Sequence, residues 1–140
     1  MEIREITLQE LKPEEFIKSQ VQQIAAAVGD GRAINALSGG VDSSVVTLLG
    51  HRALGDRLLT FFIENRLMRR GEPQRVAALF EKLGVQVKVI DAQGQFFNAL
   101  KGLTDPEEKR EAITQTFYKE VFGRLVTESG ATFLLQGSIY

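Results

Sequence analysis

An eight-residue run near the start of the chain carries residue types that hold phosphate. The run is LSGGVDSS at residues 37–44, with two adjacent glycines, three serines and one aspartate. Glycine lets the backbone approach an anion and adopt positive φ. The first amides of a helix have no intrahelical partner, and the helix dipole adds partial positive charge beside them. Between a strand and a helix, this run would therefore form a phosphate cradle, with Ser38, Ser43 and Ser44 as further donors.

The flanking residues indicate that the run does join a strand to a helix. Residues 33–37 read Ala-Ile-Asn-Ala-Leu, which is typical of a short buried strand, and residues 45–54 predict an apolar helix that ends near Gly55. The run is not a Walker loop, because no Gly-Lys-Ser or Gly-Lys-Thr follows at the required spacing. A plain Gly-Gly turn with a serine cap is the simpler interpretation, and the strand–run–helix context disfavours it.

Composition limits the classes of function. The chain has 140 residues, enough for one domain, and 44% of them are hydrophobic. A net charge of −1 argues against a nucleic-acid partner. No apolar run approaches the roughly 20 residues of a membrane-spanning helix. The absence of cysteine excludes disulfides, thiolate metal sites and a cysteine nucleophile in this chain. We expect no membrane partner and a cytoplasmic location.

Strand and helix patterns alternate along the rest of the chain. A helix is predicted from Pro13 to Val28, followed by strands at 33–37, 57–63, 85–90 and 131–135 and by helices at 45–54, 72–83 and 105–129. Alternation of this kind predicts an α/β fold with a parallel sheet and right-handed crossovers. We divide the chain into an arm with a packing helix, residues 1–30, and a domain at residues 31–140. The chain stops inside a predicted loop, so we expect a fragment of a longer protein.

Three predicted loops lie where a ligand would bind. Ligands of parallel α/β sheets lie outside the carboxyl ends of the strands, and the loops there are residues 38–44, 64–71 and 136–140. Two details outside these loops are predictions about packing. The helix at 72–83 is expected to bury Val76, Leu79, Phe80 and Leu83. The pair Phe96–Phe97 would either stack a base or pack in the core.

The glycine-rich run resembles the pyrophosphate loop of the N-type ATP pyrophosphatases, the PP-loop superfamily that includes GMP synthetase and NAD synthetase. Further runs resemble the ATP-pyrophosphatase part of GMP synthetase, particularly the free-standing subunit of archaea. They are HRALG at 51–55, LMRRGEP at 67–73, DAQ at 91–93 with FF at 96–97, ALKGLTDPEEKR at 99–110 and QGSIY at 136–140.

The resemblance implies a fold, a reaction and partners. The fold would be three-layer α/β/α, with a parallel sheet of the HUP or adenine nucleotide alpha hydrolase-like type, incomplete in this chain. The reaction would be that of a ligase of GMP and purine biosynthesis. ATP and Mg²⁺ adenylate XMP with release of pyrophosphate, and ammonia then displaces AMP to give GMP. The partners would be ATP, a nucleotide acceptor and a glutamine amidotransferase subunit that supplies ammonia. A homodimer would form through a C-terminal region beyond this chain.

The resemblance also implies roles for residues of the glycine-rich run. The amides of Gly39, Gly40, Ser43 and Ser44 would hold the β- and γ-phosphates with the Ser38 and Ser43 hydroxyls, and Val41 belongs to the same nucleotide-binding segment. Asp42 would face Mg²⁺ and pyrophosphate. Ser38, Asp42 and Ser43 are therefore the candidate catalytic residues, and Asp42 is the candidate metal ligand.

A second group of residues would surround the base and sugar. By the same resemblance, Ala36, Ile63 and Leu67 would enclose the adenine, and Gly137 would pass close to the nucleotide. Ordinary core packing is the alternative role for Ile63 and Leu67.

The sequence departs from the family pattern at three places. Arg66 replaces a glycine that could adopt positive φ, which arginine does only at a cost. Thr114 and Gln115 stand where the family has Gly-Arg, and glutamine cannot pair bidentately with an anion as that arginine would. The family's segments beyond position 140 are not in this sequence.

These departures leave the acceptor and two rival functions open. One rival is another N-type ATP pyrophosphatase, either NAD synthetase-like or tRNA-modifying. Sulfur-inserting tRNA enzymes often use cysteines, which this chain lacks. The other rival is a non-catalytic adenine-nucleotide-binding module on the same kind of sheet, against which the Ser-Gly-Gly-Val-Asp-Ser run argues.

Overall fold

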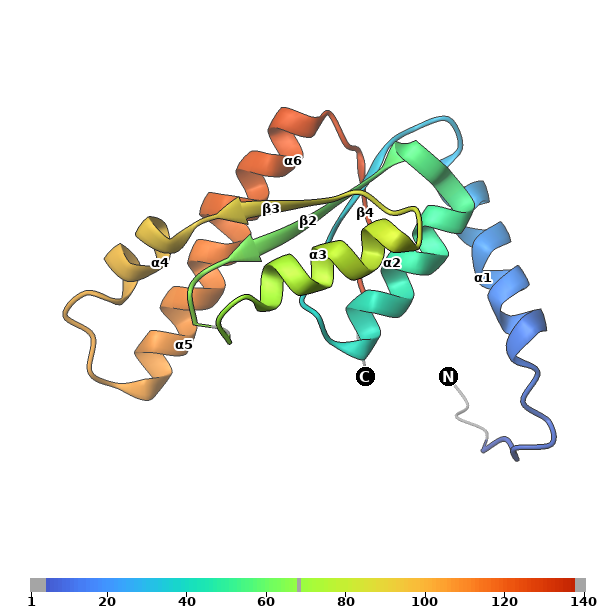
Figure 1. Cartoon of the computed structure of the whole chain (residues 1–140), viewed down its shortest axis with the longest axis horizontal. Coiled ribbons are helices and arrows are strands. Elements are labelled where there is room, and N and C mark those ends of the chain that lie inside the picture. Colours follow the sequence, from blue (N-terminus) through green and yellow to red (C-terminus); the bar gives the residue numbers. More distant parts are fainter. Residues whose placement is uncertain (1–4, 68, 138–140) are drawn as a thin grey trace.

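The structure is a computed structural model that describes residues 5–67 and 69–137. Helices and strands alternate along it as the sequence predicts (Figure 1). In chain order the elements are α1 (Pro13–Val28), β1 (Ala33–Ala36), α2 (Val41–Leu54), the 3-10 turn η1 (Gly55–Arg57), β2 (Leu58–Glu64), α3 (Glu72–Lys82), β3 (Val87–Asp91), α4 (Gln93–Leu100), α5 (Pro106–Gln115), the π-helical segment η2 (Thr116–Phe122), α6 (Gly123–Ser129) and β4 (Phe133–Leu134).

The four strands form one parallel sheet in the order β3-β2-β1-β4. Strand β1 pairs with β2 from Ala33 opposite Leu58, and it pairs with β4 from Ala33 opposite Phe133. The chain first adds strands on one side of β1, out to β3, and then returns to place β4 on the other side. The topological switch point therefore lies between β1 and β4, where parallel sheets open a crevice at their carboxyl ends.

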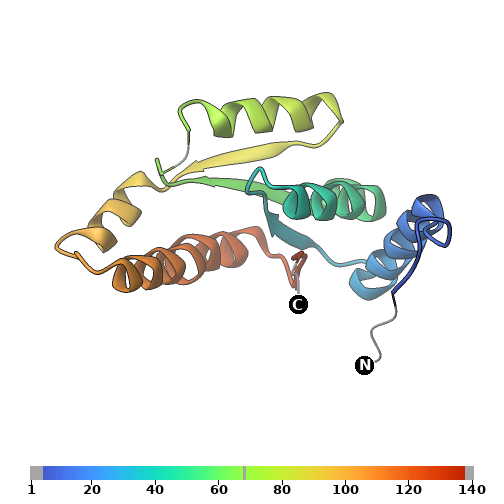
Figure 2. The same ribbon diagram turned by 90° about the horizontal axis from the view of Figure 1, so that it is seen from below.

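Helices cover both faces of the sheet, which confirms the three-layer α/β/α prediction. Figure 2 shows α3 on one side of the sheet and α5 with α6 on the other. Alternate residues of β2 serve the two layers: Phe62 packs with Phe80 of α3, whereas Phe61 packs with Phe96 and Val121 of the opposite layer. Strand β2 is thus the buried central strand that its continuous apolar sequence predicts.

The remaining packing predictions are partly confirmed. Helix α1 begins with Pro13 and packs through Val28 against Leu54 of α2, as expected of a packing helix. The predicted core face of α3 is wrong in part, because Leu79 and Leu83 are 57% and 53% exposed. Phe80, beside Leu79 in the same turn, is 3% exposed, so Leu79 and Leu83, four residues apart, lie on a stripe of α3 that does not face the sheet.

Of the two roles considered for Phe96 and Phe97, core packing applies to Phe96, whereas Phe97 is available at the surface. Phe96 is completely buried in the core, whereas Phe97 is 46% exposed.

Within residues 5–67 and 69–137, no helix combines the length and the apolar character needed to cross a bilayer.

Candidate functional site

The glycine-rich run joins β1 to α2 and leaves main-chain donors free. Gly39 has φ of 83°, a conformation that glycine adopts without steric cost. Helix α2 begins at Val41 with Gly40 as its N-cap, so residues 41–44 form its first turn. Within the described part of the chain, the amides of Gly39, Val41, Asp42 and Ser43 donate no hydrogen bond. These four amides at an exposed helix N-terminus are donors available to an anion.

The serines of the run organise the turn. The Ser38 amide donates to Ser43 Oγ at 3.1 Å, and the two hydroxyls lie 2.9 Å apart. The Ser44 hydroxyl donates to the Gly40 carbonyl at 2.7 Å, and the Ser44 amide donates to the same carbonyl. The Gly40 amide donates to Ser38 Oγ at 3.4 Å. Of the four amides that the resemblance assigns to phosphate, those of Gly39 and Ser43 are therefore free, while those of Gly40 and Ser44 have acceptors within the turn.

Two carboxylates lie at this site. Asp42 is an exposed residue in the first turn of α2. Glu72, at the start of α3, places Oε1 3.8 Å from the position that a Cβ would take on Gly39. No group of three His, Cys, Asp or Glu side chains forms a metal site among residues 5–67 and 69–137. Mg²⁺ commonly binds one or two carboxylates together with substrate phosphates, so this donor set fits the ion only in the presence of a phosphate ligand.

A pocket of about 230 Å³ opens beside the glycine-rich run, at the switch point of the sheet. It is lined by residues from the carboxyl ends of β1, β2 and β4, from α2 and from η2: Ala36, Leu37, Ser38, Ser43, Val46, Ile63, Phe117, Tyr118, Phe122, Leu134, Leu135, Gln136 and Gly137. Typical pockets for drug-sized ligands measure about 300–1,000 Å³. This volume suits one ring system with part of a sugar, with the phosphates lying on the adjacent run.

The predicted base-binding residues are only partly brought together. Ala36, Ile63 and Gly137 line the pocket, but Leu67 does not and is 51% exposed. A Cβ at Gly137 would lie 2.9 Å from Val46 Cγ2 and 3.4 Å from the Asp42 carbonyl oxygen. Glycine at position 137 is therefore required for close packing on the first turns of α2. Residues 138–140 of the third predicted loop lie outside the described residues.

The aromatic wall of the pocket was not found from the sequence. Phe117, Tyr118 and Phe122 come from the π-helical segment η2. The Phe117 and Tyr118 rings meet edge to face at 5.0 Å, and Phe117 and Phe122 stack at 6.1 Å. Helical spacing predicts a core face here but gives no sign of π-helical winding, which often occurs at functional sites.

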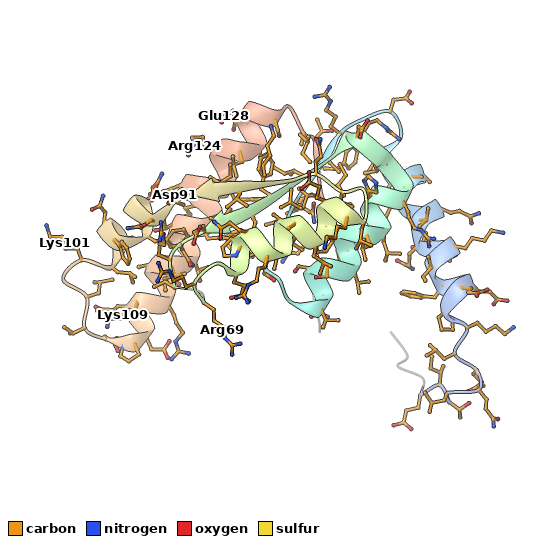
Figure 3. The ribbon with its side chains drawn as sticks, in the orientation of Figure 1. Arg69, Asp91, Lys101, Lys109, Arg124 and Glu128 are labelled. Atoms are coloured by element: carbon orange, nitrogen blue, oxygen red, sulfur yellow. The ribbon has the colours of Figure 1, made fainter. Side chains whose placement is uncertain are left out.

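The loop after β2 contains a positive φ, as the glycine-rich run does, but it carries arginines where the run carries serines. Arg66 has φ of 62°, the one positive value among described non-glycine residues, so the backbone does take the conformation that glycine would favour. Arg66 Nε lies 3.9 Å from Glu64 Oε1. The side chain of Arg69 points away from the ribbon (Figure 3). Met68 lies outside the described residues.

Gln115 is engaged within its own helix. Its Nε2 donates to Glu111 Oε1 at 2.7 Å, and the Thr114 hydroxyl donates to the Arg110 carbonyl. Both residues are exposed at the end of α5, just before the π-helical segment. Neither presents a cation to the pocket.

Comparisons with known proteins agree on the fold and the superfamily. Residues 10–120 match the family model described as NAD synthase. The chain is 50% identical over 127 residues to a subunit of the glutamine-hydrolyzing GMP synthase of Archaeoglobus fulgidus, covering 91% of this chain and 41% of that protein. It is 43% identical over 128 residues to the subunit of the same name from Methanopyrus kandleri, covering 91% and 40%.

A solved structure shares the fold. The NH₃-dependent NAD synthetase from Campylobacter jejuni, in complex with the nitrate ion, superposes with a TM-score of 0.68 at 16% identity. The match covers 93% of this chain and 69% of that one. The chain spans about two fifths of the length of the curated relatives that it matches.

Proposed function

The chain belongs to the NAD synthase family, and from this premise we propose that it is the ATP-binding part of a GMP synthase-like ligase. The observation that carries the proposal is the set of four free amides, on residues 39 and 41–43, open at the switch point beside an apolar pocket. The identity of 43–50% to subunits named GMP synthase favours GMP synthesis over NAD synthesis.

The proposed reaction has two steps that share one nucleotide. The ring oxygen of XMP attacks the α-phosphorus of ATP, and the bond to the β-phosphate breaks to release pyrophosphate. Ammonia then attacks the adenylated carbon, AMP leaves with the oxygen, and GMP remains. Negative charge develops on the leaving pyrophosphate in the first step. Donors aimed at that charge lower the barrier, and such preorganised electrostatics are usually the largest catalytic term.

Each part of the site has a role in this scheme. The amides of Gly39, Val41, Asp42 and Ser43 hold the β- and γ-phosphates, while the Ser38 and Ser43 hydroxyls complete the turn around them. The adenine enters the pocket between Ala36, Ile63 and the aromatic residues of η2. The α-phosphate would then lie between the phosphate run and the base pocket, where an acceptor would have to approach it.

Mg²⁺ belongs to this proposal as a companion of ATP. Asp42 and Glu72 are the carboxylates that would coordinate it together with phosphate oxygens. The ion would neutralise the pyrophosphate as it leaves. Asp42 then acts through its charge and not as a base that removes a proton.

The acceptor has a second candidate. Arg66 and Gln115 differ from the GMP synthetase pattern, and their side chains contact Glu64 and Glu111, none of which lines the pocket. A related ligase of the NAD synthetase type, with another acceptor and the same adenylation, would accommodate both differences.

Partners and location complete the proposal. A glutamine amidotransferase subunit would supply ammonia, as the name of the relatives implies for them. A homodimer through a C-terminal region and a cytoplasmic location both follow from the same assignment.

The direct test is pyrophosphate release from ATP by the protein, measured with and without XMP. We expect XMP to stimulate release. A lack of stimulation, with ATP still bound, would remove GMP synthesis and leave the adenylation class with another acceptor. The double variant Ser38→Ala/Asp42→Ala separates an enzyme from a binding module. An enzyme loses pyrophosphate release, whereas a module only binds ATP more weakly.

A further inference from the structure

Three polar side chains form a continuous hydrogen-bonded chain beneath the glycine-rich run. Asn35 of β1, Thr60 of β2 and Thr47 of α2 are 1%, 3% and 0% exposed. Thr60 Oγ1 donates to Asn35 Oδ1 at 2.7 Å, and Asn35 Nδ2 donates to Thr47 Oγ1 at 2.7 Å. Thr47 Oγ1 in turn donates to the Ser43 carbonyl at 2.7 Å. The buried chain therefore ends on a residue of the candidate phosphate site.

The hydrogen bond from Thr47 to the Ser43 carbonyl differs from similar bonds elsewhere in the helices. Thr47 and Ser43 are four residues apart, and threonine hydroxyls often donate to the carbonyl four residues earlier. Thr114 and Thr127 make the same bond on α5 and α6, but both are exposed and neither is tied to a strand. Only at Thr47 does such a bond continue, within the described residues, through a buried amide to two strands of the sheet.

This geometry fixes both ends of the run. Strand β1 enters the run at Ser38, and Asn35 lies three residues earlier. Ser43 is in the first turn of the helix that leaves the run. The Asn35–Thr47–Ser43 connection thus sets the distance and rotation between strand and helix, while the Ser43 hydroxyl accepts from the Ser38 amide. The four free amides lie between these two fixed points.

Polar side chains such as Asn35, Thr47 and Thr60 are rarely used at fully buried positions where packing alone is required. A buried amide and two buried hydroxyls must all find partners, and here all of them do. Apolar side chains of similar shape would fill the same space without that requirement, and such replacements are often nearly neutral for stability. The structure gives the polar chain a specific end point, the Ser43 carbonyl, that apolar packing would not hold.

We propose that Asn35 and Thr47, supported by Thr60, are positioning residues that hold the amides of residues 39–43 in the orientation that binds pyrophosphate. The inference rests on the proposed function, because it deepens the role of the same site. It adds residues that touch no ligand and act through the Ser43 carbonyl.

The central experiment uses an apolar version of the chain. The triple variant Asn35→Leu/Thr47→Val/Thr60→Val removes every member at once and leaves no orphaned partner among them. We expect it to fold with an unfolding midpoint close to that of the wild type. Its dissociation constant for inorganic pyrophosphate with Mg²⁺, measured by calorimetry, should rise about tenfold, the low end of the loss seen when a residue that orients a binding group is removed. Thr127→Val, which removes a similar bond far from the run, should change neither quantity.

Single variants keep the test decisive if the triple variant does not fold. Thr47→Val breaks the link to Ser43, whereas Thr60→Val breaks only the distant end of the chain. Both residues are buried, so their stability losses should be similar. We expect Thr47→Val to weaken pyrophosphate binding several times more than Thr60→Val. Equal effects of the two variants on binding would overturn the inference, as would a folded triple variant with wild-type affinity.

A second readout separates this inference from the proposed function. Backbone amide order parameters for residues 39–43, measured by NMR without ligand, should fall in the triple variant and in Thr47→Val. If the wild type fails to bind pyrophosphate, the proposed function is wrong, and the order parameters still test the positioning role. Unchanged order parameters in both variants would contradict that role whether or not pyrophosphate binds.

Discussion

The loops that follow β1 and β2 occupy equivalent places in the sheet, but their unbonded backbone amides are arranged differently. Both leave a buried strand at its carboxyl end, both contain positive φ and both enter a helix, α2 or α3. In the β2 loop, side chains accept from two amides, Asn65 Oδ1 from Leu67 at 3.0 Å and Glu72 Oε2 from Arg69 at 3.3 Å, while the amides of residues 65, 66, 70 and 71 donate no hydrogen bond among the described residues. In the β1 loop, residues 39 and 41–43 donate to nothing within the described part of the chain.

The difference shows what makes a helix-entering loop an anion site. A position after a parallel strand is not enough, because the loop's own side chains can satisfy its donors. The β1 loop has serines whose hydroxyls bond one another and the turn, so most amides stay available. The β2 loop offers cations on exposed side chains instead, and its strained Arg66 carries one of them. The first loop presents three free amides in succession, on residues 41–43 at the start of α2, and this arrangement suits phosphates held by the backbone.

The largest expected effect comes from removing polar groups from the first loop alone. Ser38→Ala/Asp42→Ala should lower the rate of pyrophosphate release by on the order of 100-fold or more, because the leaving pyrophosphate loses the Ser38 hydroxyl and a carboxylate that would hold its Mg²⁺. Asn65→Ala removes an amide cap from the second loop and should leave the rate within about twofold. The measurement is an enzyme-coupled pyrophosphate assay. Comparable losses in the two variants would show that the loops do not differ in function.

A matched pair of glycines gives the next largest effect. Gly39 and Gly71 have φ of 83° and 76°, so alanine at either should lower the free energy of unfolding by about 1 kcal/mol. A Cβ at Gly39 would make only ordinary contact, 3.5 Å from Val76 Cγ2, and one at Gly71 would meet nothing within 4 Å. ATP affinity, measured by calorimetry, should fall about tenfold for Gly39→Ala and stay constant for Gly71→Ala. Equal ATP affinities for these two variants would argue against phosphate binding at residues 39–43.

The smallest effect concerns strain in the second loop. Arg66→Gly should raise the free energy of unfolding by about 1 kcal/mol, because a non-glycine residue in the left-handed region costs roughly that much. The 3.9 Å pair with Glu64 is partly exposed and adds little. Chemical denaturation measures the change, with Arg69→Gly as a control that should not stabilise. A loss of stability in Arg66→Gly would mean that contacts of this side chain outweigh the backbone strain.

Much of the fold follows from local patterns in the sequence. Apolar runs interrupted by glycine and proline predict each strand and helix, and the strand–glycine–helix context predicts the phosphate run. The positive φ at Arg66 was also foreseeable, from a resemblance in which that position is glycine. The exposure of Leu79 and Leu83 was not foreseeable, because four apolar residues at helical spacing do not show which stripe of the helix faces the sheet.

The missed parts of the site depend on contacts between distant segments. Asn35 bonds to Thr47 and Thr60, 12 and 25 residues away, and no local pattern pairs them. One signal was present: each of the three is a polar residue inside an apolar run. The aromatic wall depends on the π-helical winding of η2, and Leu67 is 51% exposed and does not line the pocket, which an apolar residue in a loop does not reveal.

Chemical-shift mapping of the backbone amides during titration with pyrophosphate and Mg²⁺ tests the central claim most directly. We predict saturable shifts at Gly39, Val41, Asp42 and Ser43, with residues 64–71 largely unaffected. Absence of saturable shifts at those four amides, or a response confined to residues 64–71, would contradict the claim that free main-chain donors at the start of α2 bind the phosphates.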